Sequence, residues 1–182
     1  ANEDIEQGVC ERCGTAVVKK TLPQWVLKIT AYADRLLEGL EQLPKWPEHI
    51  KESQRNWIGR SEGYEIDFKV GNETATVFTT RPDTLYGATY LVLSPEHPLV
   101  LKFSSNVKNS KEIHTYVEVA SAKTEIERTA EGKEKTGIRL EGITAINPLS
   151  GEEMPVWVAD YVLGHYGTGA VMGVPAHDER DF

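Results

Sequence analysis

The chain has 182 residues, 40% of them hydrophobic and 26% charged, which excludes a chain that is disordered throughout. It holds no apolar run long enough to cross a bilayer and no charged-then-apolar leader, so we expect a cytoplasmic protein without a membrane partner. Most of the net charge of −8 lies in residues 63–182, which contain 11 Lys/Arg and 18 Asp/Glu residues. So acidic a segment disfavours general binding to nucleic acid, although it could still bind a short RNA end.

The first pattern along the chain is a short Cys-x-x-Cys turn at Cys10 and Cys13. Two cysteines at this spacing form half of a structural zinc site, which needs four ligands. The sequence offers no second cysteine pair, so we expect zinc not to be held well by this chain.

Two helices are predicted next. Thr21 and Gln24 match a capping box, which predicts that a helix begins there. Its apolar side chains recur at helical spacing on one face: Trp25, Ile29, Tyr32, Leu36, Leu40 and Leu43. Pro44 ends this helix, and Pro47 suits the first turn of a second one that runs to about Trp57. Residues 1–62 are therefore predicted to be a mainly helical lead-in.

The pattern changes near residue 63, where we place a domain boundary. Residues 64–70 alternate strictly between apolar and polar, Gly71-Asn72 fits a two-residue hairpin turn, and residues 73–80 form the returning strand. Further strands are predicted at 89–93, 137–140, 143–147, 154–158 and 169–174, and helices at 97–103 and 111–122. This arrangement predicts an α+β fold, a β-barrel-like domain over residues 63–182 with peripheral helices.

Hydroxyl groups gather around one cation where the second of these strands ends. The run is Thr79-Thr80-Arg81-Pro82-Asp83-Thr84, in which Pro82 keeps Arg81 out of the helical region and ends the strand. One interpretation is only a strand end followed by a capped turn. The other is a binding corner, because several hydroxyls beside an Arg can hold a carbonyl together with a phosphate or ribose.

A second polar run follows the last predicted strand. Gly167 and Gly169 permit close backbone approach, an apolar stretch that includes Met172 and Val174 follows, and Pro175 ends it. His177, Asp178, Arg180 and Asp181 come next. Acidic residues there could simply favour a helix N-terminus, which is our reading of Asp178 taken alone. For Asp181 we favour binding of a cationic ligand such as an amino group.

Together these runs resemble the editing insertion of leucyl-tRNA synthetases, which has a threonine-rich motif, here residues 79–84, and a closing motif, here residues 167–181. Residues 24–30 and 56–63 look like the synthetase body that precedes this insertion. The valyl and isoleucyl enzymes carry related editing domains, but the lead-in looks leucyl. The resemblance implies that the chain comes from a longer polypeptide.

The resemblance also implies roles for residues. Asp181 would hold the α-amino group of a misattached amino acid, and Thr84 would fill the space that the branch of leucine needs. Thr79 and Thr80 would support the reacting ester, and Arg81 would contact the tRNA end. Met172 and Val174, with His177 and Asp178, would complete the substrate-binding pocket.

The implied function is post-transfer editing: hydrolysis of the aminoacyl ester of tRNA(Leu) mischarged with norvaline, isoleucine or methionine. The expected partners are that charged 3′ end and the remainder of the synthetase. Editing needs no cofactor, and neither ATP binding nor aminoacylation is expected. Two alternatives stay open: a non-catalytic module that docks a tRNA end or a partner protein, and a zinc-ribbon scaffold built on Cys10 and Cys13.

Overall fold

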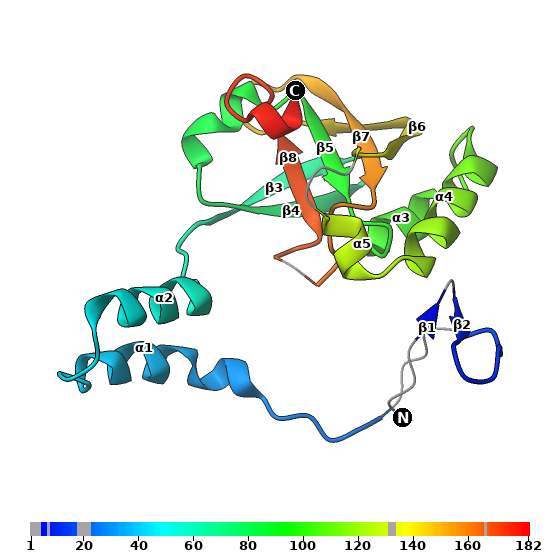
Figure 1. Cartoon of the computed structure of the whole chain (residues 1–182). Helices are drawn as coiled ribbons and strands as arrows, with labels where there is room; N and C mark the ends of the chain where they lie inside the picture. The colour runs from blue at the N-terminus through cyan, green and yellow to red at the C-terminus, as the bar shows by residue number, and fades with distance from the viewer. Residues whose placement is uncertain (1–4, 7, 18–22, 131–133, 166) are drawn as a thin grey trace. The chain divides into compact units, whose positions relative to one another are not determined.

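The structure is a computed structural model that describes residues 5–6, 8–17, 23–130, 134–165 and 167–182 (Figure 1). It divides into two compact units. One is Lys19–Glu62, and the other combines Gly63–Phe182 with Ala1–Val18. The predicted lead-in 1–62 is thus divided between the units. No helix among the described residues is long and apolar enough to span a membrane.

The first unit contains a 3-10 turn, η1 (Ile29–Tyr32), and two helices, α1 (Ala33–Glu41) and α2 (Glu48–Ile58). The second helix forms as predicted and ends at Gly59 in the left-handed conformation. The first begins later than predicted, because residues 23–28 are not helical, while Thr21 of the predicted capping box lies outside the described residues. Trp25 is fully exposed, so no packing offsets the cost of ordering this stretch as helix.

The N-terminal segment holds a small hairpin that the sequence did not predict. Its strands are β1 (Ile5–Glu6) and β2 (Val9–Cys10), with Ile5 paired to Cys10. The Cys10-to-Cys13 turn follows directly, closed by a hydrogen bond from the Gly14 N–H to the Cys10 carbonyl (2.8 Å).

The second unit is built on one sheet, which contains six strands in the described part of the chain, in the order β4-β3-β6-β7-β5-β8. Their bounds are β3 Tyr64–Val70, β4 Glu73–Thr79, β5 Tyr90–Leu93, β6 Gly137–Ile146, β7 Glu153–Ala159 and β8 Ala170–Gly173. All neighbours are antiparallel except β5 and β7. The end strands β4 and β8 also approach one another, so the sheet is strongly curved. The predicted α+β, barrel-like class is confirmed.

Strand β6 corrects one expectation. The sequence predicts separate strands at 137–140 and 143–147, but a single strand runs through both, with a register shift against β7 between Arg139 and Thr144. Gly142 lies in this irregularity with φ +89°. Because the strand continues on both sides of Gly142, this positive φ angle marks a bulge here.

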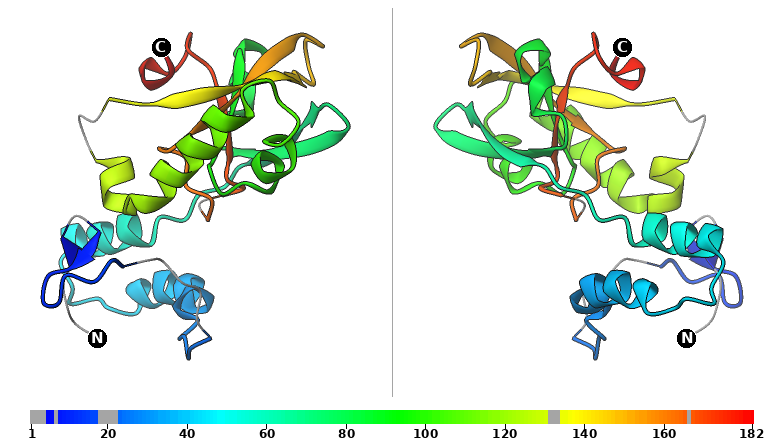
Figure 2. Two further views of the ribbon diagram at one scale, coloured as in Figure 1. Left: turned by 90° about the vertical axis from the view of Figure 1, so that its right-hand side faces the viewer. Right: turned by 90° about the vertical axis from the view of Figure 1, so that its left-hand side faces the viewer.

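Three helices accompany the sheet: α3 (Pro98–Phe103), α4 (Ser110–Ala122) and α5 (Glu125–Thr129). Leu99 of α3 and Ile113 of α4 belong to the main apolar core with the inward side chains of the sheet, and α4 lies along β6 (Figure 2). The sequence did not predict α5, although Thr124 and Glu127 form a complete capping box there.

Candidate functional site

The first part of the candidate site is the threonine-rich turn, residues 79–87, which joins β4 to β5. The Thr79 hydroxyl accepts a hydrogen bond from the Arg81 N–H (3.0 Å), and Pro82 then begins a six-residue 3-10 helix, η2 (Pro82–Gly87). Inside this helix the Thr84 hydroxyl donates to the Arg81 carbonyl (2.9 Å). Thr79 is half-buried, Thr80 is exposed, and Thr84 is buried with 4% of its surface exposed.

Arg81 and Asp83 form a two-pronged ion pair at the outer side of this turn. The guanidinium Nε and Nη2 atoms lie 3.0 and 2.8 Å from the two carboxylate oxygens. Hydrogen bonding by Arg81 lowers the pKa of Asp83, and the same carboxylate raises the pKa of Arg81. No side-chain hydrogen bond caps the start of η2, and both carboxylate oxygens of Asp83 are paired with Arg81.

The second part is the closing segment, residues 174–182, which follows β8. It turns back on itself: the His177 N–H donates to the Val174 carbonyl (2.8 Å), and a short 3-10 turn, η3 (Glu179–Asp181), follows. The Asp181 carboxylate then accepts a hydrogen bond from the Val174 N–H (2.9 Å). His177 is exposed, whereas Asp178 and Asp181 are half-buried.

The two parts meet beside the His177 ring. A methyl group placed on Gly87 would lie 3.5 Å from His177 Cδ2, which is ordinary van der Waals contact. His177 also contributes to the lowered pKa of Asp83, after the larger effect of Arg81. Thus the fold brings together the two motifs that the sequence singled out, and both lie at the same end of the sheet (Figure 1).

Met172, on β8, and Val174, just after it, are buried. They are 9% and 8% exposed and belong to the same apolar core as Leu85 of the threonine-rich turn. Met172 pairs with Leu91 across β8 and β5, so both side chains are on the inner face of the sheet.

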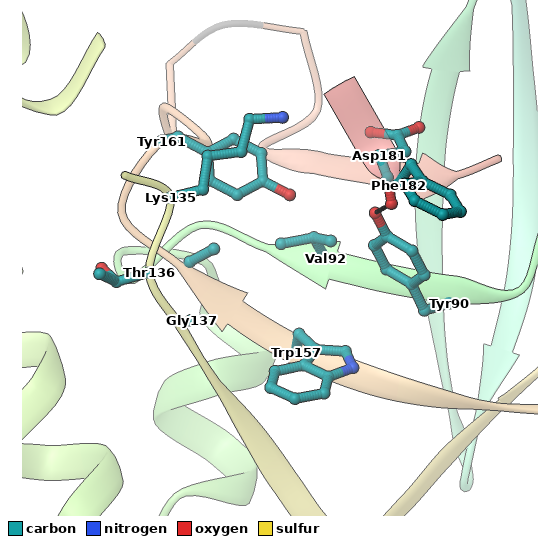
Figure 3. A pocket seen from close by; sticks show the side chains of 10 residues that line it. Tyr90, Val92, Lys135, Thr136, Gly137, Trp157, Tyr161, Asp181 and Phe182 are labelled. Carbon is teal, nitrogen blue, oxygen red and sulfur yellow. Dashed lines mark hydrogen bonds between the residues drawn. The ribbon is translucent and has the colours of Figure 1, made fainter. Parts of the chain in front are cut away.

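Asp181 also lies at a cavity of about 310 Å³ on the opposite, outer face of β5 (Figure 3). Four of the ten residues that line it are aromatic, namely Tyr90, Trp157, Tyr161 and Phe182, and Lys135 lies 4.9 Å from the centre of the Tyr161 ring. The threonine-rich turn does not line this cavity. The structure therefore separates Asp181, which lines it, from Thr79 and Thr84, which do not.

Two residues that contact the candidate site, Tyr90 and Asn147, were not identified from the sequence. Tyr90 donates from its hydroxyl to the Asp181 carbonyl (2.9 Å), and its ring lies where a side chain on Gly173 would stand. Burial, followed by the charges of Asp181 and Asp178, raises the Tyr90 pKa. The buried amide of Asn147 contacts the end of η2. Neither the strand pattern around Tyr90 nor the Asn147-Pro148 sequence indicates these contacts with residues far away in the chain.

Cys10 and Cys13 are free thiols. Among the described residues no group of three or more His, Cys, Asp or Glu side chains is placed to hold a metal ion. The exposed Cys13 thiol contacts the Thr15 hydroxyl (3.2 Å), and this hydrogen bond lowers the Cys13 pKa.

Comparisons with known proteins show the family to which the chain belongs. A family model described as leucyl-tRNA synthetase, editing domain, matches residues 55–182, well over half of the chain. Among solved structures, the chain resembles the Agrobacterium radiobacter K84 agnB2 LeuRS in its ternary complex with tRNA and LeuAMS. The identity is 42%, the TM-score is 0.70, and the match covers 96% of this chain. It covers only 22% of that synthetase, so the chain spans about a fifth of the length of the structure that it matches.

Proposed function

Because the chain belongs to the family of leucyl-tRNA synthetase editing domains, we propose that it hydrolyses the aminoacyl ester of mischarged tRNA(Leu). The observation that carries this proposal is the meeting of the threonine-rich turn with the closing segment beside His177. The two motifs come from distant parts of the chain and approach one another at Gly87 and His177, while the Asp181 carboxylate lines the cavity on the outer face of β5. The proposed substrates carry norvaline, isoleucine or methionine in place of leucine.

In this proposal Asp181 selects for the ammonium group of the esterified amino acid. The hydrogen bond from the Val174 N–H uses its Oδ2 atom and fixes the direction of the carboxylate. A carboxylate held in this way binds an ammonium group without first losing side-chain freedom. An amino acid whose amine is acylated should therefore be a poor substrate.

Thr84 supplies discrimination against leucine. Its side chain is buried, and its hydroxyl bond to the Arg81 carbonyl holds it in one rotamer. A fixed group in a tight pocket rejects a larger ligand by overlap, which is the task of an editing site when binding alone separates amino acids poorly. Met172 and Val174 would provide the apolar surface for the unbranched or differently branched side chain.

The reaction itself needs only water. The water oxygen bonds to the ester carbonyl carbon, the bond to the ribose oxygen breaks, and a proton passes to that oxygen, giving free amino acid and uncharged tRNA. Thr79 and Thr80 would hydrogen-bond the developing oxyanion, and Arg81 would contact the RNA end. A neighbouring ribose hydroxyl of the substrate can orient the water, so no protein base is assigned.

The affinity for tRNA must come largely from elsewhere. Residues 63–182 have 11 basic against 18 acidic side chains, which opposes contact with a phosphate backbone. We therefore propose that the rest of a longer synthetase binds the tRNA body and presents the 3′ end. Cofactors play no part, and zinc at Cys10 and Cys13 is not required.

The test compares deacylation of Ile-tRNA(Leu) and Leu-tRNA(Leu) by this chain and by a full-length synthetase that carries it. Each is made with the natural residue, with Asp181→Ala, and with Asp67→Ala as a matched control. Asp67 is a carboxylate on β3 that accepts a bond from the Thr76 hydroxyl (2.6 Å), away from the closing segment. Selective loss of the isoleucyl ester, abolished by Asp181→Ala alone, would support editing. Absence of hydrolysis in both proteins would overturn it and favour a non-catalytic docking module.

A further inference from the structure

The side chain of Asn147 joins two segments of the second unit. It lies where β6 ends and the turn to β7 begins, and it is almost fully buried, with 1% of its surface exposed. A buried primary amide must satisfy two N–H donors and one carbonyl acceptor. The partners of this one lie in different parts of the chain.

The carbonyl half of the amide serves the β6–β7 turn. Asn147 Oδ1 accepts hydrogen bonds from the backbone N–H groups of Leu149 (2.9 Å) and Ser150 (3.3 Å). The Asn147 backbone closes the same turn through bonds with Glu152 and Gly151 (both 2.9 Å). This half is local turn chemistry of the kind asparagine commonly provides.

The amino half serves the threonine-rich turn instead. Asn147 Nδ2 donates to the Leu85 carbonyl (2.9 Å) and to the Ala88 carbonyl (3.4 Å), 62 and 59 positions away in the sequence. The carbonyls at the end of a short 3-10 helix lack donors further along the helix. The Leu85 carbonyl has the Ala88 N–H as its one backbone donor (3.1 Å), so the amide supplies a second.

We infer that Asn147 is a positioning residue for Thr84. Thr84 is adjacent to Leu85, and η2 is anchored at its start by the Thr84 and Arg81 contacts and at its end by Asn147. If the end is released, the backbone that carries Thr84 can move relative to Met172 and Val174. This inference rests on the proposed function in one respect: Thr84 must be the group that rejects leucine.

The substitution Asn147→Asp separates the two halves of the amide. A carboxylate of the same shape still accepts from Leu149 and Ser150 but cannot donate when ionised, and it places negative charge against two carbonyl oxygens. Asn147→Ser is a second variant that introduces no buried charge and is too short to reach η2. If the buried charge prevents Asn147→Asp from folding, Asn147→Ser still tests the inference.

Asn109 offers a matched control. Its amide also bridges two elements, donating to the Arg139 carbonyl (2.8 Å) and accepting from the Glu141 N–H (3.3 Å). These contacts tie the start of α4 to β6 and do not touch η2. Asn109→Asp therefore makes the same chemical change at another sheet contact.

The experiment has two readouts. The first is the ratio of Ile-tRNA(Leu) to Leu-tRNA(Leu) hydrolysis by the full-length synthetase, corrected for the folded fraction. We expect Asn147→Asp and Asn147→Ser to lower this ratio about ten-fold, the size expected for losing a buried hydrogen bond, and Asn109→Asp to leave it within about two-fold. A purely structural role would scale both esters equally, and an unchanged ratio would overturn the inference.

The second readout is amide hydrogen exchange over residues 82–90 of the 182-residue chain, which needs no substrate. Exchange should become at least about five-fold faster in the Asn147 variants and stay unchanged in Asn109→Asp. If the natural protein hydrolyses neither ester, the proposed function fails while this readout still decides whether Asn147 holds the turn. Unchanged exchange in folded Asn147 variants would refute the positioning role whatever the activity.

Discussion

The backbone N–H of Val174 and the Oδ2 atom of Asp181 lie 2.9 Å apart, in a hydrogen bond that spans seven residues of the closing segment. The Tyr90 hydroxyl holds the same residue from the neighbouring strand, through the Asp181 carbonyl (2.9 Å). Asp181, whose carboxylate we assign to amine recognition, is therefore held at two points: the Val174 N–H binds its carboxylate, and the Tyr90 phenol binds its backbone carbonyl.

Tyr90→Phe should lower kcat/KM for Ile-tRNA(Leu) about three- to ten-fold, since it removes one hydrogen bond from Asp181 and leaves the ring over Gly173. The measurement is steady-state deacylation by the full-length synthetase. Tyr64→Phe, a change at an exposed tyrosine on β3, is the control and should have no effect. Equal losses in both variants would argue against a role for the phenol.

Replacements at Thr84 should separate its methyl group from its hydroxyl. Thr84→Val keeps the volume and loses the bond to the Arg81 carbonyl, whereas Thr84→Ser keeps the bond and loses the methyl. If leucine is rejected by overlap, Ser and Ala should permit Leu-tRNA(Leu) hydrolysis and Val should still prevent it. Leu-tRNA(Leu) that survives the Ala variant would contradict the assignment of this pocket.

The ion pair at Arg81 and Asp83 should be visible in a carboxyl titration. The Asp83 pKa is lowered in the folded protein, so the pair favours folding above the unfolded pKa and loses its effect as the pH falls through the lowered value. Both groups are exposed, so the gain in stability should be small. In Arg81→Ala, the Asp83 carboxyl carbon should titrate at higher pH by NMR, and an unmoved titration would contradict the pairing.

His97 should make stability depend on pH in mildly acidic solution. Its Nδ1 atom accepts from the Leu99 N–H (3.2 Å) and caps α3, and burial lowers its pKa below the ordinary 6.5. Protonation opposes folding here, so this stabilisation is complete above about pH 6.5 and is lost as the pH falls through the lowered pKa.

Urea unfolding at pH 7 and pH 5 checks the histidine. His97→Asn keeps a capping oxygen without titrating and should reduce the stability difference between the two pH values, while His97→Ala should cost about 1 kcal/mol at pH 7. His114→Asn, at an exposed position on α4, is the control. An identical pH dependence in the natural protein and in His97→Asn would remove His97 as the cause.

Zinc should bind weakly to the chain and have no effect on hydrolysis. Cys10 and Cys13 provide two thiols where a structural site uses four ligands. A metal-indicator titration should give no stoichiometric tight binding, and EDTA should leave deacylation unchanged. Tight binding that disappears in Cys13→Ser would restore a metal role for this turn.

Local patterns predicted much of the fold. The strict alternation at Tyr64–Val70 and the following Gly71 fixed a hairpin whose register runs from Tyr64–Thr79 to Val70–Glu73. The helix predicted from Thr21 does not form over residues 23–28. Helical spacing indicates that one face is apolar, but it does not show which part of the protein would cover that face. Trp25 and Leu27 remain exposed, and propensity alone does not hold a short helix together.

The site was predictable only in part for a similar reason. The two motifs could be recognised as runs of residues, and the structure brings them near one another at Gly87 and His177. The assigned roles of Thr79, Thr80, Arg81 and Asp181 remain proposals. Tyr90 and Asn147 could not be found, because each acts through a backbone group far away in the sequence, and such contacts leave no periodic pattern.

The order of strands in the sheet has a consequence for synthesis of the protein. Among the six strands of the sheet, β4 is the second to be synthesised and β8 the sixth, yet they approach each other at the two ends of one curved sheet. Likewise, Tyr90 is synthesised 91 residues before Asp181, its hydrogen-bond partner. Pairings this distant in sequence form slowly, so the hairpin of β3 and β4 should exist on the nascent chain while its threonine-rich turn is still without a partner. The two parts of the candidate site can therefore come together only after translation has passed residue 181.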